Sequence, residues 1–256
     1  MQHLDIQSYT NTLIQIADDK KRFLNTLANS EATMHSRVTA RMMIASYDWF
    51  VFQLNFTAGM PAEALASSLD GVILSFEAHA KELRLSSNPY SRAAFNLADS
   101  IDEYVDYLNF LSALVLLKRT DLLPRAAGLL AETIVDGQDA IVEDLLKFFI
   151  ADRPAPDTSY WRKPYQILID AIDAESKTGA ARKMQQYVKK WYPAMKGQAS
   201  FWEKHKQIVP EFSPYCGYWA MCAAAFTYLY ALDDSSYRDE LVYPRSLIDY
   251  ARSQSR

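Results

Sequence analysis

Apolar residues recur at steps of three and four along most of the chain, and this spacing restricts the fold more than any other feature of the sequence. The clearest run shares one helical face and consists of Met34, Val38, Met42, Ala45, Trp49, Phe52 and Phe56. Alternation with a period of two, the pattern of a half-buried strand, is absent. The chain holds only 7 glycines, so it is also poor in the turns that join β-hairpins. The sequence therefore predicts an all-α fold with little or no sheet.

Glycine, proline and polar breaks divide this pattern into helices. Gly59 ends the second helix, and Pro61 suits the first turn of the third. The expected helices span about residues 5–28, 34–58 and 61–85, a stretch after the break at 86–89 that ends near 119, and then 121–134, 138–150, 160–175, 178–192, 199–208, 214–232 and 244–252. We expect an antiparallel helical array or bundle of about ten to twelve helices.

The expected helices form two closely packed subdomains, an N-terminal one over residues 1–125 and a C-terminal one over 126–256. The clearest linker-like segment is 153–157, with the sequence Arg-Pro-Ala-Pro-Asp. The N-terminus lacks a basic region followed by an apolar stretch, so no signal peptide is predicted and we expect a cytoplasmic protein.

The sequence offers no recognisable catalytic or metal motif. Its four histidines are isolated from plausible nucleophiles, and neither a His-Glu-x-x-His pair nor a Gly-rich phosphate loop occurs. Cys216 and Cys222 lie six apart without a histidine nearby, which favours buried thiols in a reducing compartment over a metal site. We therefore expect a protein that is not an enzyme and that needs no cofactor or metal.

Charge is distributed unevenly along the chain. Residues 99–144 hold ten acidic residues against three basic ones, a net charge of −7. Residues 177–206 hold eight basic residues against one acidic residue, a net charge of +7. Separated poles of this kind either steer a charged partner or form well-solvated helix faces.

The acidic pole contains two clusters with helical spacing. The first cluster is Asp99, Asp102, Glu103 and Asp106, and the second is Asp136, Asp139, Glu143 and Asp144. Carboxylates at such spacings share a helix face and repel one another, so they destabilise the helix unless positive charges or hydrogen-bond donors compensate them. Three interpretations remain open, namely a negative surface for a basic partner, solvated faces with helix N-terminal acids, and a metal site.

The basic pole interleaves lysines with Tyr187, Trp191, Tyr192, Phe201 and Trp202. Basic residues among aromatic ones can bind nucleic acid. The acidic sequence pI of about 5.6 instead favours core aromatics with lysines on the wet side, so we expect no direct nucleic-acid binding. On the second helix, Arg37, Arg41 and Asp48 interrupt an apolar face, and we expect them to pair with buried polar groups.

The last forty residues have an unusual composition. They begin with Tyr218-Trp219, continue through an alanine-rich apolar helix to Asp233-Asp234-Ser235-Ser236-Tyr237-Arg238, and end with Tyr243-Pro244 and a short helix. We interpret the set Tyr218, Trp219, Asp233, Asp234, Tyr237, Arg238, Tyr243 and Pro244 as a structural lock that ties a polar turn to the core.

This segment, together with Leu247 and the run 249–252, resembles the C-terminal domain of the PoNe immunity (PoNi-like) proteins. Residues 160–161 and 201–202 fit the same resemblance. The first 120 residues resemble that family's N-terminal helical domain more loosely. Cys222 and Ser246 stand where the resemblance leads us to expect acidic residues.

The resemblance implies a cytoplasmic immunity protein in interbacterial competition. Such a protein neutralises a DNA-degrading toxin of the PD-(D/E)xK nuclease superfamily, which neighbouring bacteria deliver, for example by type VI secretion. It acts by binding and occluding the toxin, and it is not an enzyme.

A nuclease must present a positive cleft to bind phosphates, and clustered carboxylates can occupy that cleft. We therefore predict that both acidic clusters bind the toxin, while the C-terminal lock serves the fold. Two other functions stay open. One is a helical adaptor without a toxin partner, and the other is an all-helical enzyme that uses the acidic residues with a divalent metal.

Overall fold

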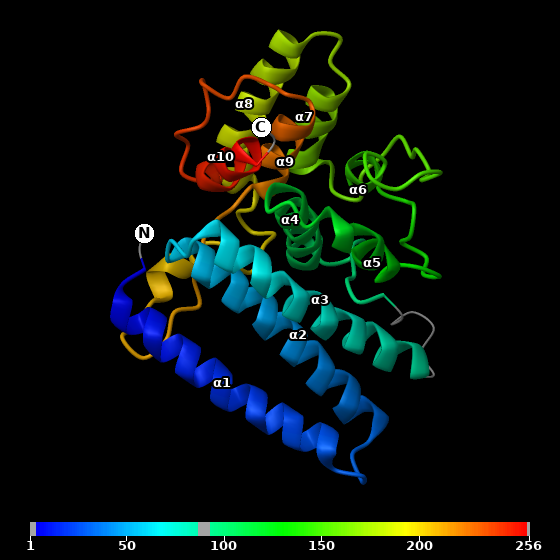
Figure 1. Ribbon diagram of the computed structural model, residues 1–256, viewed down its shortest axis with the longest axis vertical. Coiled ribbons are helices and arrows are strands. Elements are labelled where there is room, and N and C mark those ends of the chain that lie inside the picture. Colours follow the sequence, from blue (N-terminus) through cyan, green and yellow to red (C-terminus); the bar gives the residue numbers. More distant parts are fainter. Residues whose placement is uncertain (1–3, 87–92, 255–256) are drawn as a thin grey trace. The chain divides into compact units, whose positions relative to one another are not determined.

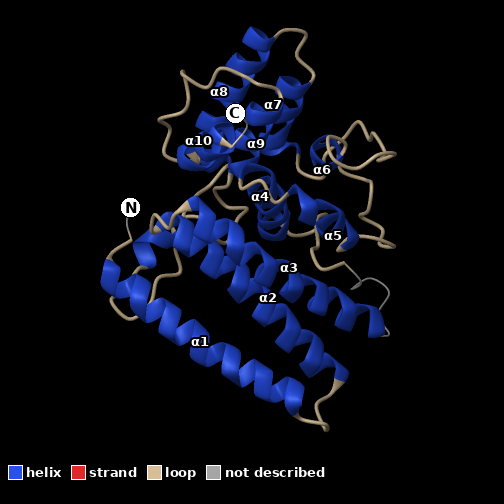
Figure 2. Cartoon of the chain, in the orientation of Figure 1, coloured by secondary structure: helices blue, strands red, loops and turns tan. Residues whose placement is uncertain are grey.

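The computed structural model describes residues 4–86 and 93–254, and this part of the chain is helical (Figures 1 and 2). An isolated antiparallel bridge between Val209 and Phe212 is the extended pairing within these ranges. The all-α prediction is therefore confirmed. The α-helices of the described part are α1 (Ile6–Ala28), α2 (Met34–Thr57), α3 (Ala62–Leu85), α4 (Ile101–Leu116), α5 (Leu123–Gly128), α6 (Ala140–Leu146), α7 (Arg162–Ile172), α8 (Lys177–Ala194), α9 (Met221–Leu229) and α10 (Arg245–Ser253), with short 3-10 helices η2 (Thr120–Leu122) and η3 (Lys204–Gln207).

Contacts divide the chain into two compact units. Unit 1 comprises residues 1–94, 129–133 and 203–217, and unit 2 comprises 95–128, 134–202 and 218–256. Both units are discontinuous in sequence. A subdomain boundary at residue 125 stays a prediction about which segments fold independently.

Unit 1 is built on the long helices α1, α2 and α3, of which α2 packs against both others. Asp5 caps α1 by accepting from the backbone N–H groups of Gln7 and Ser8 at 2.9 Å, as sequence statistics for helix starts predict. Thr33 caps α2 in the same way. The segment 203–217 returns to α1, where the Ser213 N–H donates to Thr12 Oγ1 at 2.7 Å.

Unit 2 is built around α4, whose residues from Tyr107 to Leu116 are all buried. Helices α9, α10 and α5 pack against it. Helices α7 and α8 form an antiparallel pair, because Asp170 meets Lys183 at 3.4 Å and the rings of Tyr165 and Tyr187 lie 6.0 Å apart. In this pair, α8 packs against α9, and the Tyr165 ring of α7 meets the Tyr104 ring of α4 at 4.9 Å.

Several helix boundaries differ from the sequence-based expectation. The predicted helix 199–208 is wrong as an α-helix, since only the short η3 forms there. The predicted helix 214–232 is confined to α9, because Gly217 adopts a left-handed φ of 104° and the Asn109 amide replaces helical partners. That amide donates to the Trp219 carbonyl at 2.9 Å and accepts from the Met221 N–H at 3.1 Å. The expected break at 86–89 lies mostly outside the described residues.

Within the described residues, no helix combines the length and the apolar character needed to cross a membrane.

Candidate functional site

The first acidic cluster lies at the start of α4. Ser100 is the N-cap of this helix and accepts from the Glu103 N–H at 3.3 Å, so Asp99 precedes the helix. The prediction that all four carboxylates share one helix face is therefore wrong for Asp99, which is exposed in the preceding turn. Asp102 and Glu103 occupy the first helical turn, where the helix dipole favours negative charge.

Backbone N–H groups hold two of these carboxylates in place. Both oxygens of Asp102 accept from the Ser200 N–H, at 2.9 and 3.1 Å, and Glu103 Oε2 accepts from the Asn96 N–H at 2.7 Å. Asp102, Glu103 and Asp106 are half-buried. We name Asp99, Asp102, Glu103 and Asp106 the acidic edge. The hydrogen-bond donors of Asp102 and Glu103 are neutral backbone groups, so these bonds add no positive charge beside either carboxylate.

The second acidic cluster lies largely inside unit 2. Glu143 is only 1% exposed, and Arg153 clamps it with two hydrogen bonds of 2.6 and 2.5 Å. The same guanidinium reaches Asp136 at 2.9 Å. Arg153 belongs to the segment interpreted from sequence as a linker, so its structural role was missed. A bidentate guanidinium–carboxylate pair is the strong kind of charged hydrogen bond, and it marks this cluster as part of the fold.

Asp139 is also 1% exposed and caps α6. Its carboxylate accepts from the N–H groups of Ile141 and Val142, the Tyr104 hydroxyl and the Tyr160 N–H, all at 3.0 Å. Burial raises the pKa of Asp139, and the hydrogen bonds oppose that rise. Asp139 and Glu143 thus do not contribute to an exposed acidic face, contrary to the prediction, because internal donors satisfy both carboxylates.

The remaining member of the second cluster, Asp144, forms an ion pair with Lys147 one turn later on the surface of α6. This pair cancels the charge of Asp144 locally. The two clusters therefore differ in their hydrogen-bond donors. In the acidic edge, Asp102 and Glu103 accept from backbone N–H groups, whereas basic side chains bind Asp136, Glu143 and Asp144 in the second cluster.

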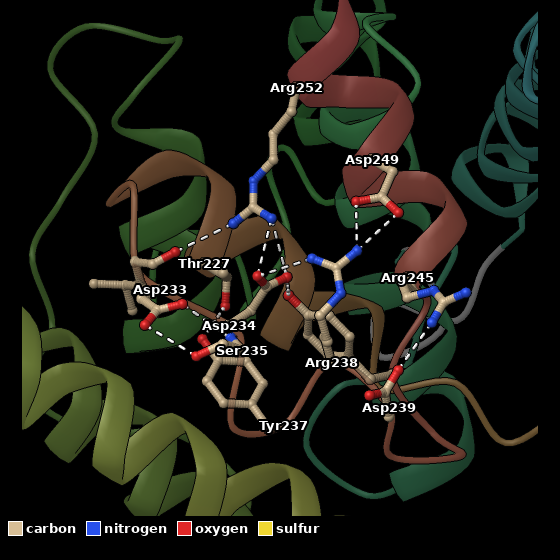
Figure 3. A network of polar contacts seen from close by, with 12 residues as sticks. Thr227, Asp233, Asp234, Ser235, Tyr237, Arg238, Asp239, Arg245, Asp249 and Arg252 are labelled. Atoms are coloured by element: carbon tan, nitrogen blue, oxygen red, sulfur yellow. Dashed lines mark hydrogen bonds and ion pairs between the residues drawn. The ribbon is translucent and has the colours of Figure 1, made fainter.

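The C-terminal lock is centred on Asp234, which is 4% exposed (Figure 3). Its carboxylate accepts from Arg238 at 3.2 Å, from Arg252 at 3.0 and 3.1 Å, and from the Tyr243 hydroxyl at 3.2 Å. Two guanidinium groups and a phenol hydroxyl thus compensate this buried carboxylate, and a buried charge is tolerated when it is paired and hydrogen-bonded in this way.

Further bonds extend this network to α9 and α10. Arg238 also clamps Asp249 at 2.8 and 2.9 Å, and Arg252 donates to the Leu232 carbonyl at 3.2 Å. The hydroxyls of Tyr237 and Thr227 lie 2.9 Å apart. The network therefore joins the end of α9, the polar turn and α10 into one piece, the geometry expected of a structural lock.

Asp233, Tyr218, Trp219 and Pro244, the other members of the predicted lock, make contacts that do not involve the Asp234 carboxylate. Asp233 stabilises its own turn by accepting from the Ser235 N–H and hydroxyl at 3.0 Å. The Tyr218 ring stacks on Tyr192, and Pro244 is buried at the start of α10. The backbone carbonyl of Trp219 accepts a hydrogen bond from the Asn109 side chain.

The basic pole and the second-helix cations are arranged largely as expected from sequence. Tyr187 and Trp191 are buried, while Tyr192, Phe201 and Trp202 are half-buried and most of the lysines are exposed. In unit 1, Arg37 Nε donates to the buried Glu82 at 2.7 Å, with Arg41 Nε 3.8 Å from the same carboxylate. Asp48 accepts from Lys20 and Ser75.

The described residues contain no group of three or more His, Cys, Asp or Glu side chains placed to hold a metal ion. Burial lowers the pKa of His79 to about 4, so its imidazole is neutral near pH 7. Cys222 is buried beside the Tyr187 hydroxyl at 3.1 Å, and burial raises its pKa to about 11. A thiol with a pKa this high is a poor nucleophile.

Comparisons with known proteins concern the fold and the C-terminal region of the chain. No protein among the curated ones matches the chain. Among solved structures, protein PA2201 from Pseudomonas aeruginosa shares the fold, with a TM-score of 0.64 and 18% identity over 95% of this chain and 90% of that one. The model of the PoNe immunity proteins (PoNi), C-terminal, matches residues 137–247, a span that holds α6 to α9 and Asp234. Over this C-terminal region the chain is similar to the PoNe immunity proteins.

Proposed function

We propose that this chain is a cytoplasmic immunity protein that binds and neutralises a DNA-degrading toxin of the PD-(D/E)xK nuclease superfamily. The observation that carries the proposal is the family match over residues 137–247. The toxin is one that competing bacteria deliver through a type VI or similar secretion system. The immunity protein acts by binding and occlusion rather than by catalysis.

The acidic edge supplies the contact with the toxin. A nuclease cleft must be cationic to hold phosphates, so a surface of clustered carboxylates competes for the same groups. Backbone N–H groups fix Asp102 and Glu103, so less side-chain freedom is lost on binding. Asp136, Asp139, Glu143 and Asp144 are left out of this contact, because their carboxylates already serve Arg153, α6 and Lys147.

Co-expression in bacteria with the toxin domain encoded beside this gene tests the proposal. The wild-type chain should restore growth, keep chromosomal DNA intact and co-purify with the toxin. Toxicity that persists, with no complex recovered, would overturn the immunity function and leave the helical adaptor as the better interpretation.

A charge-neutralised variant tests the role of the acidic edge. It combines Asp99→Asn, Asp102→Asn, Glu103→Gln and Asp106→Asn, which keep hydrogen-bond acceptors at the bonded positions. The matched control removes four exposed acids elsewhere in unit 2 with Asp152→Asn, Asp157→Asn, Asp173→Asn and Glu175→Gln. The first variant should weaken binding by about 100-fold or more and the control by less than about threefold. Equal effects would reject the acidic edge as the contact.

A further inference from the structure

One aromatic side chain of α8 holds both ends of a long loop. The Tyr192 ring lies 4.2 Å from the Trp202 ring and 4.3 Å from the Tyr218 ring, with interplanar angles of 19° and 28°. Stacking this close leaves room for one ring on each face, so Tyr192 lies between the other two. Trp202 and Tyr218 immediately flank the segment 203–217. We name this segment the strap and the three-ring stack the clip.

The backbone turns sharply at both ends of the strap. Glu203 follows Trp202 with a left-handed φ of 58°, and Gly217 precedes Tyr218 with a left-handed φ of 104°. Residues other than glycine seldom adopt such a φ, so the surrounding structure must hold Glu203 in place. The strap therefore has the geometry of a compact surface loop of about 6–16 residues whose ends lie close together.

Two hydrogen bonds fasten the strap to the first half of α1. The Asn11 side-chain amide donates to the Pro210 carbonyl at 2.9 Å. The Ser213 N–H donates to Thr12 Oγ1 at 2.7 Å. Ser213 and Thr12 are both fully buried, so water does not compete for this second bond.

The end of the strap is attached to α2. The Thr57 hydroxyl, in the last turn of α2, donates to the Cys216 carbonyl. Tyr215, the residue before Cys216, is buried. Because α2 is itself well packed, with Trp49 and Phe52 among its buried side chains, the strap connects α1 to a firmly held helix.

Helix α1 is the least buried of the three long helices of unit 1. All of its residues are described, and the buried ones are Ser8, Thr12 and Ile16, so α1 buries a single apolar side chain. In comparison, α2 buries nine side chains and α3 buries ten. An element with few buried apolar contacts can open locally while the rest of a protein stays folded.

Side-chain hydrogen bonds also join α1 to α2. The Tyr9 hydroxyl donates to Asn55 Oδ1 at 2.8 Å, and the Tyr47 hydroxyl donates to Asp19 at 3.3 Å. These residues are half-buried, so water can replace their partners when the helices separate and each bond stabilises the contact only modestly. The bonds from the strap are therefore a substantial part of what keeps α1 in place.

We propose that α1 and the strap form one movable element, which opens as a unit while α2, α3 and unit 2 stay folded, and that the clip keeps this element closed. Without the Tyr192 ring both ends of the strap are free, and the strap then loses more conformational freedom when it binds α1. Opening uncovers the side of α2 that contacts α1, including Tyr47 and Asn55.

Hydrogen exchange of the full chain, followed by mass spectrometry and NMR, tests whether the element opens as a unit. In the wild-type protein, the hydrogen-bonded amides of Val209, Phe212 and Ser213 should share the protection factor of the α1 amides within about threefold. The amides of the buried helix α4 should exchange at least about tenfold more slowly.

Substitutions at each end of the proposed linkage test its cause. Tyr192→Ala removes two stacking contacts and should raise the exchange rates of α1 and the strap about tenfold, without changing those of α4, whereas Tyr192→Phe keeps the ring and should retain most of the protection. Thr12→Val removes the acceptor of the Ser213 N–H and should accelerate α1 and the strap together. The matched control is Phe148→Ala, which removes a ring contact with Tyr230 elsewhere in unit 2 and should change α1 by less than about twofold.

The outcomes decide the inference independently of the proposed function, because none of these measurements uses a toxin. Strap amides that exchange independently of α1 in the wild-type protein would overturn it, as would wild-type exchange of α1 in both Tyr192→Ala and Thr12→Val. If Tyr192→Ala also accelerates exchange in α4, Thr12→Val decides, since Thr12 lies in unit 1. Acceleration of α1 together with the strap in that variant supports the movable element, and acceleration of α1 alone overturns it.

Discussion

The two acidic clusters of this chain have similar sequences and different surroundings. The acidic edge precedes and opens α4, where backbone N–H groups bind Asp102 and Glu103. The second cluster surrounds Arg153 and the start of α6, with Asp139 and Glu143 almost fully buried. Helical spacing shows which carboxylates share a face, but the partner on the opposite side decides whether that face is buried.

The chemistry of the donor explains the difference. A guanidinium offers five N–H donors and a full positive charge, so it can accompany two carboxylates into the interior. A backbone N–H satisfies lone pairs without cancelling charge, so carboxylates bound only in this way stay at the surface. The first arrangement suits the fold, and the second leaves negative charge for a partner.

Removing Arg153 should have the largest effect on the stability of the fold. The Arg153→Met variant leaves Glu143 buried without a cation, which should lower the free energy of unfolding by about 3–5 kcal/mol. Urea denaturation followed by circular dichroism measures this loss. The double variant Arg153→Met, Glu143→Gln should recover part of it. A loss below about 1 kcal/mol would show that the second cluster is as dispensable for folding as a surface cluster.

His79 should make the stability of the fold depend on pH below neutrality. Burial lowers its pKa from 6.5 to about 4, so between these values the unfolded chain binds the proton and the folded chain does not. The free energy of unfolding should therefore fall as pH decreases from 7 to 4, by up to about 3 kcal/mol. The His79→Leu variant should flatten this part of the profile, and an unchanged slope would assign the acid sensitivity to other groups.

Sequence periodicity predicted the long helices well, because α1, α2 and α3 combine an apolar stripe with local caps such as Asp5 and Thr33. It failed over residues 199–220, where long-range partners decide the backbone. Trp191 and Phe201 stack with ring centroids 5.9 Å apart, and Asn109 takes the hydrogen bonds that a longer α9 would have made. Neither interaction has a local signal in the sequence.

The candidate site was predictable in part for the same reason. The acidic edge follows from four residues close in sequence, whereas the burial of Glu143 depends on Arg153 in a proline-rich break. Likewise Asp234 and Arg238 are one turn apart, but the second cation, Arg252, lies 18 residues after Asp234. The sequence did contain one signal for this role. Arg153 stands beside prolines and shortly after an acidic helix, so it could have been expected to pair with a carboxylate of that helix.

The N-caps of α6 and α4 give a smaller and closely matched comparison. Asp139→Ala removes the cap of α6 and also leaves the Tyr160 N–H without this acceptor, while the Tyr104 hydroxyl keeps only its bond to Ser159, so the loss should be about 2 kcal/mol. Ser100→Ala removes one capping bond from α4 and should cost about 1 kcal/mol or less. Thermal unfolding of both variants measures the difference. Equal losses would mean that the buried bonds of Asp139 add nothing to its cap.

The smallest effect on stability is expected at Asp99. This side chain is exposed in a turn outside the helix, so Asp99→Asn should change the free energy of unfolding by less than about 0.5 kcal/mol. The same change should still slow association with the toxin at low salt, because the field of a charged surface acts over about 10 Å at about 0.1 M salt. Stopped-flow association rates at two salt concentrations measure it. A variant with unchanged stability and a reduced, salt-dependent association rate is what a surface kept for a partner requires, and a variant with neither change would place Asp99 outside that surface.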